Sequence, residues 1–399
     1  MTFSDFNLHP TLLESLSAMG FEKPTPIQEQ AIPYIMQNCD LIACAQTGTG
    51  KTAAFLLPVI HNLLLKPNAK HSINTVVIAP TRELALQIDQ QVEGFGYYAP
   101  VTSAPVYGGG DGATWDQQKR AIVHGADILI ATPGRLIAHM QLGYVDFSHV
   151  QHLVLDEADR MLDMGFHDDI MMIVKALPAK RQTLLFSATM PPKIRQLAKS
   201  ILNSPREISI AISKPAAGIL QAAYFVNDSS KNGLVKHLLM GKKIASTLIF
   251  ASTKIKVKKL EQELRRMGLS VAAIHSDLEQ AEREKVLSSF RAHQVQILVA
   301  TDILSRGIDM DDIGLVINYD NANSPEDYVH RIGRTARAES TGVAITFIND
   351  LEREDFKRVE QLIGKAVQKI ALPPHLEGGT NEKPRKAGNG RQGRSFSRR

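Results

Sequence analysis

The sequence predicts two α/β domains, each a doubly wound parallel sheet, joined by a short linker and followed by a disordered basic tail. Short runs rich in Val, Ile and Leu alternate with helical patterns, as expected of buried parallel strands and their crossover helices. The 399 residues are too many for one ordinary core and enough for two. Pro215 and Gly218 interrupt both patterns near the middle of the chain, where we expect the linker.

The predicted strands divide between the two halves of the chain. The first half has runs at 40–44, 75–79, 127–131, 152–155 and 183–186, and the second at 247–250, 271–274, 296–300, 315–318 and 343–347. Helical spacing of apolar residues is clear in segments such as 82–93 and 254–267. The predicted division is a short first segment, a first domain, a linker, a second domain and a tail, at 1–29, 30–211, 212–218, 219–371 and 372–399.

The positive charge of the chain is concentrated in this tail. Lys and Arg number 46 against 41 Asp and Glu, a net charge of +5. Residues 372–399 contain seven of the basic residues and two of the acidic ones, so residues 1–371 are neutral. With hardly any apolar residue, the tail is expected to be disordered. Its charge of one sign favours a polyanionic partner, and a tail that only aids solubility is the alternative.

Composition excludes several classes of protein. At 44% hydrophobic and 22% charged residues, the chain is neither wholly disordered nor collagen-like. No apolar stretch approaches the ~18 residues that span a bilayer, and the start of the chain lacks a signal-peptide pattern. Cys39 and Cys44 are the only cysteines, and the 13 histidines show no zinc-ligand spacing. We expect a cytoplasmic protein with reduced thiols, no membrane attachment and no metal cluster.

Polar signatures follow the predicted strands at their carboxyl ends, where open α/β sheets bind ligands. The run at 40–44 leads into a Gly-rich sequence that precedes a helical pattern, as in phosphate-binding loops. Its glycines allow backbone amides to surround phosphate oxygens, Lys51 would reach the β- and γ-phosphates, and Thr52 would hold Mg²⁺. A Gly-rich turn that only caps a helix is the alternative. The predicted phosphate loop is Ala45, Gln46, Thr47, Gly48, Thr49, Gly50, Lys51 and Thr52.

Two further groups of charged residues complete a phosphate site. Asp156 and Glu157 follow the run at 152–155, where an aspartate suits Mg²⁺ and a glutamate could deprotonate a water. Arg331, Arg334 and Arg337 have a spacing that would align them on one face of a helix, as arginine fingers from the second domain. The alternatives are that Asp156 and Glu157 only begin a helix, and that the three arginines lie on an exposed basic helix. Asp309 could accept hydrogen bonds from ribose hydroxyls.

Taken in order, these signatures resemble those of the DEAD-box ATP-dependent RNA helicases over about residues 3–350. The tail and the segment PAKRQTLLFSAT are most similar to the bacterial RhlE type. The resemblance implies two RecA-like domains with ATP and RNA in the cleft between them. It also implies that Phe21 stacks on adenine, that Gln28 reads its edge, and that Ser187 and Thr189 couple hydrolysis to strand separation, with His330 contacting them on closure.

The same resemblance assigns RNA contacts in both domains. Hydroxyls, backbone amides and scattered arginines suit contacts to phosphate and sugar, which position RNA without reading its sequence. The first-domain candidates are Pro80, Thr81, Arg82, Gly108, Gly109, Thr132, Pro133, Gly134 and Arg135. The second-domain candidates are Thr253, His275, Gln280, Arg283 and Thr301. Three residues depart from the family pattern. Ala336 replaces the usual Gly and, if that position requires a positive φ, would shift the helix start and place Arg337 less well, whereas Ser305 and Ser276 are small changes with no expected loss of activity.

We therefore expect an RNA-stimulated, Mg²⁺-dependent ATPase that opens short RNA duplexes or remodels RNA–protein complexes when the cleft closes. Single-stranded RNA and short duplexes are the expected partners, with ribosomal precursors or RNA-degradation assemblies as candidate settings. An ATP-gated RNA clamp that barely unwinds is the main alternative, and a DNA translocase is the third. Damage to the acidic or Ser-Ala-Thr motif would favour the clamp, and both motifs are intact.

Overall fold

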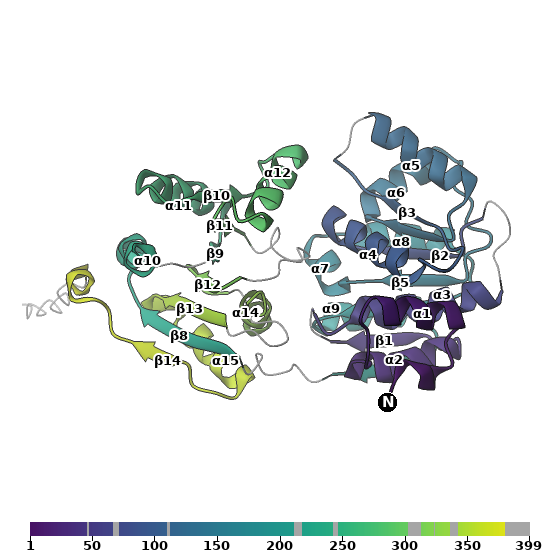
Figure 1. Cartoon of the computed structure of the whole chain (residues 1–399), viewed down its shortest axis with the longest axis horizontal. Coiled ribbons are helices and arrows are strands. Elements are labelled where there is room, and N and C mark those ends of the chain that lie inside the picture. The colour runs from purple at the N-terminus through teal and green to yellow at the C-terminus, as the bar shows by residue number, and fades with distance from the viewer. Residues whose placement is uncertain are drawn as a thin grey trace, which may run out of the picture.

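Each half of the chain forms a seven-stranded sheet whose recorded strand pairings are all parallel, with helices packed around it (Figure 1). The computed structural model describes residues 1–399 except 46–47, 67–71, 110–111, 211–217, 242–245, 302–312, 323, 336–341 and 380–399. Two doubly wound parallel sheets confirm the predicted fold class. No helix in the described part of the chain is both long and apolar enough to cross a membrane.

The first sheet has the strand order β3-β4-β2-β5-β6-β1-β7. Its strands are β1 (Leu41–Cys44), β2 (Thr75–Ile78), β3 (Ser103–Val106), β4 (Ile128–Ala131), β5 (His152–Leu155), β6 (Gln182–Ser187) and β7 (Arg206–Ser209). The described helices of this half are η1 (Phe3–Phe6), α1 (Pro10–Ala18), α2 (Pro26–Met36), α3 (Lys51–Leu65), α4 (Arg82–Phe95), α5 (Gly112–His124), α6 (Pro133–Gln141), α7 (Ala158–Asp163), α8 (His167–Ala176) and α9 (Pro192–Ile201).

The second sheet has the order β10-β11-β9-β12-β13-β8-β14, which repeats the first when strands are numbered within each half. Its strands are β8 (Ile219–Phe225), β9 (Thr247–Phe250), β10 (Val271–Ile274), β11 (Ile297–Ala300), β12 (Leu315–Asn318), β13 (Gly342–Ile348) and β14 (Gln368–Ile370). The described helices are η2 (Asp228–Ser230), α10 (Lys231–Leu239), α11 (Lys254–Arg266), α12 (Gln280–Arg291), α14 (Pro325–Ile332), η3 (Asp350–Glu352), α15 (Arg353–Ile363) and η4 (Pro374–Gly379).

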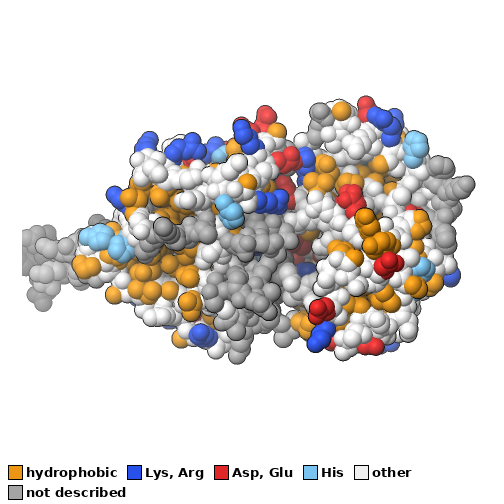
Figure 2. Space-filling model, in the orientation of Figure 1, with side chains coloured by type: hydrophobic (Ala, Val, Ile, Leu, Met, Phe, Trp, Pro, Cys, Tyr) orange, Lys and Arg blue, Asp and Glu red, His pale blue; other side chains and the backbone are white. Residues whose placement is uncertain are grey.

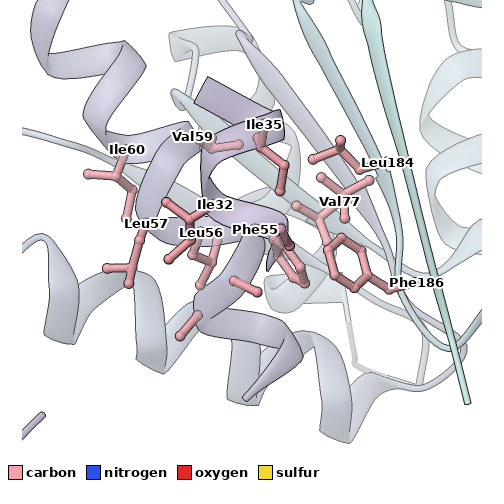
Figure 3. Close-up of a cluster of buried hydrophobic side chains, with 14 of the residues drawn as sticks. Ile32, Ile35, Phe55, Leu56, Leu57, Val59, Ile60, Val77, Leu184 and Phe186 are labelled. Carbon is pink, nitrogen blue, oxygen red and sulfur yellow. The ribbon is translucent and has the colours of Figure 1, made fainter. Parts of the chain in front are cut away.

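Apolar side chains pack on both faces of the first sheet. One cluster joins α2 and α3 to the strands, and Figure 3 shows Phe55 of α3 beside Phe186 of β6, with ring centroids 5.2 Å apart. A second cluster lies beneath α6, α8 and α9. The N-terminal segment belongs to the first cluster through Phe3 and Ile27, and α2 runs through the predicted division at residue 29. The first 29 residues are therefore part of the first domain's core.

Four strands have no counterpart among the predicted runs. β3 and β7 form the two edges of the first sheet, and β14 and β8 are the last two strands of the second. β3 contains Pro105, and three of the four residues of β7 are exposed. An edge strand is covered on fewer sides than a central one and does not need a continuous apolar run. This accounts for the edge strands β3, β7 and β14, but not for β8, which pairs with both β13 and β14. The edge strand β10 was identified from its apolar run.

The predicted start of the tail at residue 372 is too early. Leu372 and Leu376 pack against the second domain's core, and η4 covers Pro374–Gly379. A methyl group added to Gly233 of α10 would lie 2.7 Å from Leu376 Cδ2, so this contact is close. This Pro- and Gly-rich segment thus packs on the second domain through its two leucines. The remainder of the tail, residues 380–399, and most of the predicted linker lie outside the described residues.

Candidate nucleotide and RNA sites

A cavity of about 260 Å³ lies where the predicted phosphate loop, the acidic motif and the second domain meet. β1 and β5, which precede the loop and the acidic motif, flank β6 in the sheet, so their carboxyl ends lie close together. Side chains from both domains line the cavity: Phe21, Gln28, Gly48, Gly50, Lys51, Thr52, Ala53, Leu84, Gln87, Gln91, Asp156, Glu157 and Arg334. Residues that are far apart in the sequence thus share one polar cavity.

The loop presents a lysine and a helix N-terminus to this cavity. Lys51 is the first residue of α3, is 7% exposed, and donates from Nζ to the carbonyl oxygen of Ala45 at 2.7 Å. Gly50 precedes it with φ +87°, and a Cβ there would lie 2.4 Å from Gln28 Nε2. Only glycine fits both the left-handed backbone and that close approach. The predicted loop residues Gln46 and Thr47 lie outside the described residues.

Gln28 and Phe21 also line the cavity, and Gln28 contacts the phosphate loop directly. Gln28 is 1% exposed, accepts the Thr25 amide at Oε1 (2.9 Å) and donates from Nε2 to the Gly50 carbonyl (3.1 Å). Phe21 is half-buried, with edge-to-face contacts to Phe3 at 6.2 Å and Phe95 at 5.6 Å. These contacts hold both side chains in place. Gln28 is thus a buried brace of the phosphate loop as well as a candidate for reading a base.

The acidic pair at the end of β5 combines burial with backbone strain. Burial raises the pKa of Asp156 to about 6, although the charge of Lys51 acts in the opposite direction. Glu157 has φ +50°, a left-handed conformation that is unfavourable for a residue with a side chain. Its Oε2 accepts a hydrogen bond from Arg160 at 3.1 Å. Strain and a shifted pKa both concentrate at functional sites, and here they occur at neighbouring residues.

Asp159, to which the sequence assigned no role, contacts the predicted Ser-Ala-Thr motif. Its Oδ2 accepts hydrogen bonds from the Thr189 amide at 2.9 Å and the Thr189 hydroxyl at 2.8 Å. The Ser187 hydroxyl donates to the Thr189 carbonyl at 2.7 Å. The acidic motif and the Ser-Ala-Thr motif are therefore joined directly. The last aspartate of the tetrapeptide 156–159 was the available signal, but its partner is 30 residues away.

The arginines of the second domain do not form the predicted helical row. α14 ends at Ile332, so Arg331 lies on the helix and Arg334 in the turn beyond it. Arg331 donates to the Asp320 carbonyl at 2.7 Å inside the second domain, whereas Arg334 lines the cavity. The expected alignment was wrong because the helix stops before Arg334. His330 is buried on α14, and the predicted site residues Arg337 and Asp309 lie outside the described residues.

The candidate RNA residues follow equivalent strands in the two domains. In the first sheet they come after neighbouring strands β3, β4 and β2, and in the second after β10, β11 and β9, at the same end of each sheet. Thr81 and Thr253 begin equivalent helices, and their hydroxyls accept the amides of Leu84 and Lys256, each at 3.3 Å. The first-domain set is Pro80, Thr81, Arg82, Gly108, Gly109, Thr132, Pro133, Gly134 and Arg135; the second is Thr253, His275, Gln280, Arg283 and Thr301.

Two ion pairs connect these sets across the domains. Arg82 at the start of α4 lies 2.5 Å from Glu284 of α12, and Arg283 of α12 lies 3.6 Å from Glu83. The Arg82 guanidinium also lies over the ring of Tyr107, 4.4 Å from its centroid. Figure 2 shows basic side chains over α11 and α12 with acidic ones among them. This mixture agrees with the charge neutrality of residues 1–371.

His275 differs from the other second-domain candidates because it is almost enclosed. Burial, together with the charge of Lys258, lowers the pKa of its ring, so the ring is neutral at pH 7. Its Nδ1 is buried without a hydrogen-bond partner. Gln280 begins α12, which also carries Arg283. A buried polar atom without a partner is uncommon and marks this ring as a feature to explain.

The first domain supplies a phosphate loop and two acidic residues after β5, and the second domain, which has the same topology, supplies an arginine. This arrangement is that of a two-domain RecA-like nucleoside triphosphatase. Two family models match the chain: DEAD/DEAH box helicase over residues 25–197, and Helicase conserved C-terminal domain over residues 230–339. The chain belongs to the DEAD-box family of ATP-dependent RNA helicases.

Curated relatives and a solved structure agree with this assignment. The chain is 42% identical to the ATP-dependent RNA helicase CshA of Listeria monocytogenes, covering 93% of this chain and 70% of that protein. It is 40% identical to the ATP-dependent RNA helicase DeaD of Haemophilus influenzae, covering 94% and 61%. Saccharomyces cerevisiae Dbp5 bound to RNA and ADP BeF3 matches with a TM-score of 0.82 at 31% identity, covering 93% and 95%.

Proposed function

We propose that this chain uses ATP hydrolysis in the cavity between its domains to open short RNA duplexes or remodel RNA–protein complexes. The observation that carries the proposal is that Lys51, Asp156 and Glu157 of the first domain share one cavity with Arg334 of the second. A site divided between two domains is complete only when they approach, so the chemistry depends on closure. Relatives described as ATP-dependent RNA helicases support ATP as the nucleotide and RNA as the partner.

In this proposal each cavity residue has one task. Lys51 and the N-terminus of α3 bind the phosphates, Glu157 takes a proton from the attacking water, and Arg334 stabilises the charge that develops on the γ-phosphate. Phe21 and Gln28 hold the adenine, and Asp309 the ribose. Arg337 is a second finger, Ser187 and Thr189 transmit hydrolysis to the RNA side with His330, and Asp159 joins them to the acidic motif.

Mg²⁺ is the metal that this donor set fits. The Thr52 hydroxyl and the Asp156 carboxylate line one cavity, and a cation would offset the burial that raises the pKa of Asp156 to about 6. The described residues contain no group of three metal-ligating side chains, as expected where nucleotide phosphates complete the coordination. When bound, the cation would neutralise negative charge on the phosphates.

Several finer assignments belong to the same proposal. RNA binds across the two sets of candidate residues through its backbone, and the basic residues beyond Gly379 add affinity. The linker lies at 212–218, the first domain includes residues 1–29, and the second includes the segment to Gly379. The protein acts in the cytoplasm on ribosomal precursors or RNA-degradation assemblies. The relatives described above are CshA and DeaD proteins. Assignment to the RhlE subtype is therefore supported by the segment PAKRQTLLFSAT and the tail alone.

An ATP-gated clamp with little unwinding is the second candidate. The Thr189–Asp159 hydrogen bonds favour unwinding, because they join the acidic motif to the coupling motif rather than leaving the two apart. Strand displacement on matched RNA and DNA duplexes separates the candidates. A helicase opens the RNA duplex with ATP, a clamp holds RNA without opening it, and a translocase opens the DNA duplex.

Glu157→Gln tests the assignment of the base. The variant should lose RNA-stimulated ATP hydrolysis by about 10²–10⁴-fold, the usual contribution of a positioned base, while still binding ATP and retaining RNA in the closed state. Glu93→Gln, which removes an exposed carboxylate of α4, is the matched control and should hydrolyse ATP at the unchanged rate. Near-normal hydrolysis by Glu157→Gln would show that another group is the base.

A further inference from the structure

A network of aromatic and amide side chains surrounds Arg135, one of the candidate RNA residues. Trp115 and Gln118 lie three residues apart on α5, and Arg135 and His139 lie four apart on α6, so each pair shares one helix face. The Trp115 and His139 rings stack at 4.0 Å with an angle of 15°, and the Arg135 guanidinium lies 4.1 Å from the Trp115 centroid. The arginine is thus held against an aromatic surface.

Gln118 is the polar centre of this network. Its Oε1 accepts Arg135 Nε at 2.8 Å and His139 Nε2 at 3.2 Å, and its Nε2 donates to the Tyr107 carbonyl at 3.0 Å. Because His139 donates from Nε2, its Nδ1 accepts the Tyr144 hydroxyl. The side chain of Gln118 is 4% exposed, so these bonds are shielded from water. Gln118 therefore accepts at its oxygen and donates from its nitrogen within one buried network.

The network leaves one donor of Arg135 unused. Nη2 of Arg135 is buried and has no hydrogen-bond partner, although Nε is occupied by Gln118. Burial and the charge of Arg135 lower the pKa of His139 to about 4, so a neutral ring lies beside the guanidinium at pH 7 and does not repel it. A buried guanidinium donor without an acceptor favours an anion such as a phosphate oxygen.

The network also connects three separate candidate RNA signatures. Gln118 binds the backbone of Tyr107, the residue before Gly108, and the Tyr107 ring lies beneath Arg82 at 4.4 Å. Arg82, the Gly-Gly pair and Arg135 follow three different strands, β2, β3 and β4. A displacement of Gln118 would therefore disturb the spacing of phosphate-binding groups across this end of the sheet.

We infer that Trp115, Gln118 and His139 are positioning residues for RNA binding, which hold Arg135 with one guanidinium edge presented to an RNA phosphate. The inference rests on the proposed RNA-binding function and adds to it the groups that orient the arginine. A packed aromatic and amide support reduces the conformational entropy that a long arginine side chain loses on binding. The network of Trp115, Gln118 and His139 then contributes to RNA affinity in addition to the charge of Arg135.

The test compares two neighbouring glutamines of α5. Gln118→Leu removes the bonds to Arg135, whereas Gln117→Leu makes the same change at an exposed position and is the matched control. The probe is a short fluorescein-labelled single-stranded RNA, whose binding to the full chain is followed by anisotropy at several salt concentrations. Gln118→Leu should weaken binding about tenfold, and its plot of log K against log salt should become shallower by up to about 0.7, the contribution of one phosphate contact. Gln117→Leu should match the unchanged chain.

A double-variant cycle separates positioning from general destabilisation. In an Arg135→Ala background, Gln118→Leu should cause no further loss of RNA affinity, because the group that it orients is gone. An undiminished loss in that background, or equal binding by Gln118→Leu and the unchanged chain, would overturn the inference. If the unchanged chain itself fails to bind RNA, the proposed function fails instead.

Trp115 supplies a second readout that does not depend on Gln118→Leu folding well. It is the only tryptophan of the chain, so intrinsic emission reports on the stack directly. Unlabelled RNA should change this emission in the full chain, and Arg135→Ala should abolish the change. Trp115→Phe should retain most RNA affinity and Trp115→Leu should lose it, because only the former keeps an aromatic surface under Arg135. Equal affinities for these two variants would contradict the role of the ring.

Discussion

The first and second domains share one strand order but differ at the start of the helix that follows their first strands, β1 and β8. In the first domain that connection contains Gly48 and Gly50, both with positive φ, and α3 begins at Lys51. In the second domain the connection forms the short helix η2, and α10 begins at Lys231. The lysine is kept in the same position, while the glycines that open a phosphate site are absent.

The partners of the two lysines explain the difference in chemistry. Lys51 donates to the carbonyl of Ala45 beside the cavity, whereas Lys231 lies 2.8 Å from Asp228, 3.2 Å from Asp320 and 3.9 Å from Glu352. Carboxylates of the protein thus take the place that phosphates would occupy. We infer that the second domain uses this position for stability, and that the same topology serves catalysis only where the loop leaves the lysine available.

Two aspartates at the carboxyl ends of corresponding strands, the first residue after β5 and the second after β12, have pKa values shifted in opposite directions. Asp156 follows β5 and Asp320 follows β12, the corresponding strand of the second sheet. Burial raises the pKa of Asp156 to about 6. Burial would also raise the pKa of Asp320, but hydrogen bonds from Lys256 and Ser252 and the charge of Lys231 outweigh it and lower the pKa to about 2. Lys51 acts on Asp156 through its charge, whereas Lys231 and Lys256 both donate hydrogen bonds to Asp320.

The largest expected effects on activity and stability come from replacing each of the two lysines by an uncharged residue. Lys51→Ala should lower ATP hydrolysis by about 10²–10³-fold, because it removes the cation that faces the phosphates. Lys231→Met should leave the KM for ATP unchanged but reduce the free energy of unfolding by about 1.5–3 kcal/mol, because buried Asp320 loses one of its two lysine partners and keeps Lys256. Steady-state ATPase kinetics and urea unfolding measure the two effects. A stable Lys231→Met protein that no longer binds ATP would contradict the inference that Lys231 serves stability and not nucleotide binding.

Substitution of Asp156 and of Asp320 should give stability changes of opposite sign at pH 7. Asp156→Asn should raise the free energy of unfolding of the nucleotide-free protein by on the order of 2 kcal/mol, since the folded state no longer holds a buried charge. Asp320→Asn should lower it by a similar amount, because a paired carboxylate is lost. Urea unfolding of the two variants and the unchanged chain measures both differences.

The pH dependence follows from the two pKa shifts. The advantage of Asp156→Asn should shrink as pH falls from about 6 towards 4, where Asp156 of the unchanged chain becomes protonated in the folded state. The contribution of Asp320 should persist to about pH 4 and disappear as pH falls towards 2. Destabilisation by both substitutions at pH 7 would contradict the assigned difference between the domains.

The smallest expected effect tests the RNA side, where the domains are alike. Thr81→Val and Thr253→Val each remove a helix N-cap at an equivalent position, which should cost about 0.5–2 kcal/mol of stability in either domain. Each should also weaken RNA binding several-fold and to a similar extent, if both hydroxyls contact the backbone. Thermal unfolding and RNA anisotropy measure the pair. A loss of RNA affinity confined to one variant would show that the two domains do not share the RNA equally.

The sequence was most informative where neighbours along the chain carry the signal. Central strands appear as apolar runs, and the helices at 82–93 and 254–267 correspond to α4 and α11. The phosphate loop was predicted because strand, glycines, lysine and helix follow one another directly. The edge strands β3, β7 and β14 and the inner strand β8 had no predicted run, and the helical row of arginines failed because α14 ends at Ile332.

The sequence by itself determined the class of fold, the phosphate loop, the acidic motif and the family, because each is written in contiguous residues. Only the tertiary structure decided which polar groups meet: Asp159 with Thr189, Gln118 with Arg135, and Lys231 with Asp320, which are separated by 30, 17 and 89 residues. A single aspartate or glutamine has no pattern of its own, and its partner depends on how the strands are ordered in the sheet. Burial then sets the energy of each pair, since a charge that is removed from water is stable only where the fold supplies a partner.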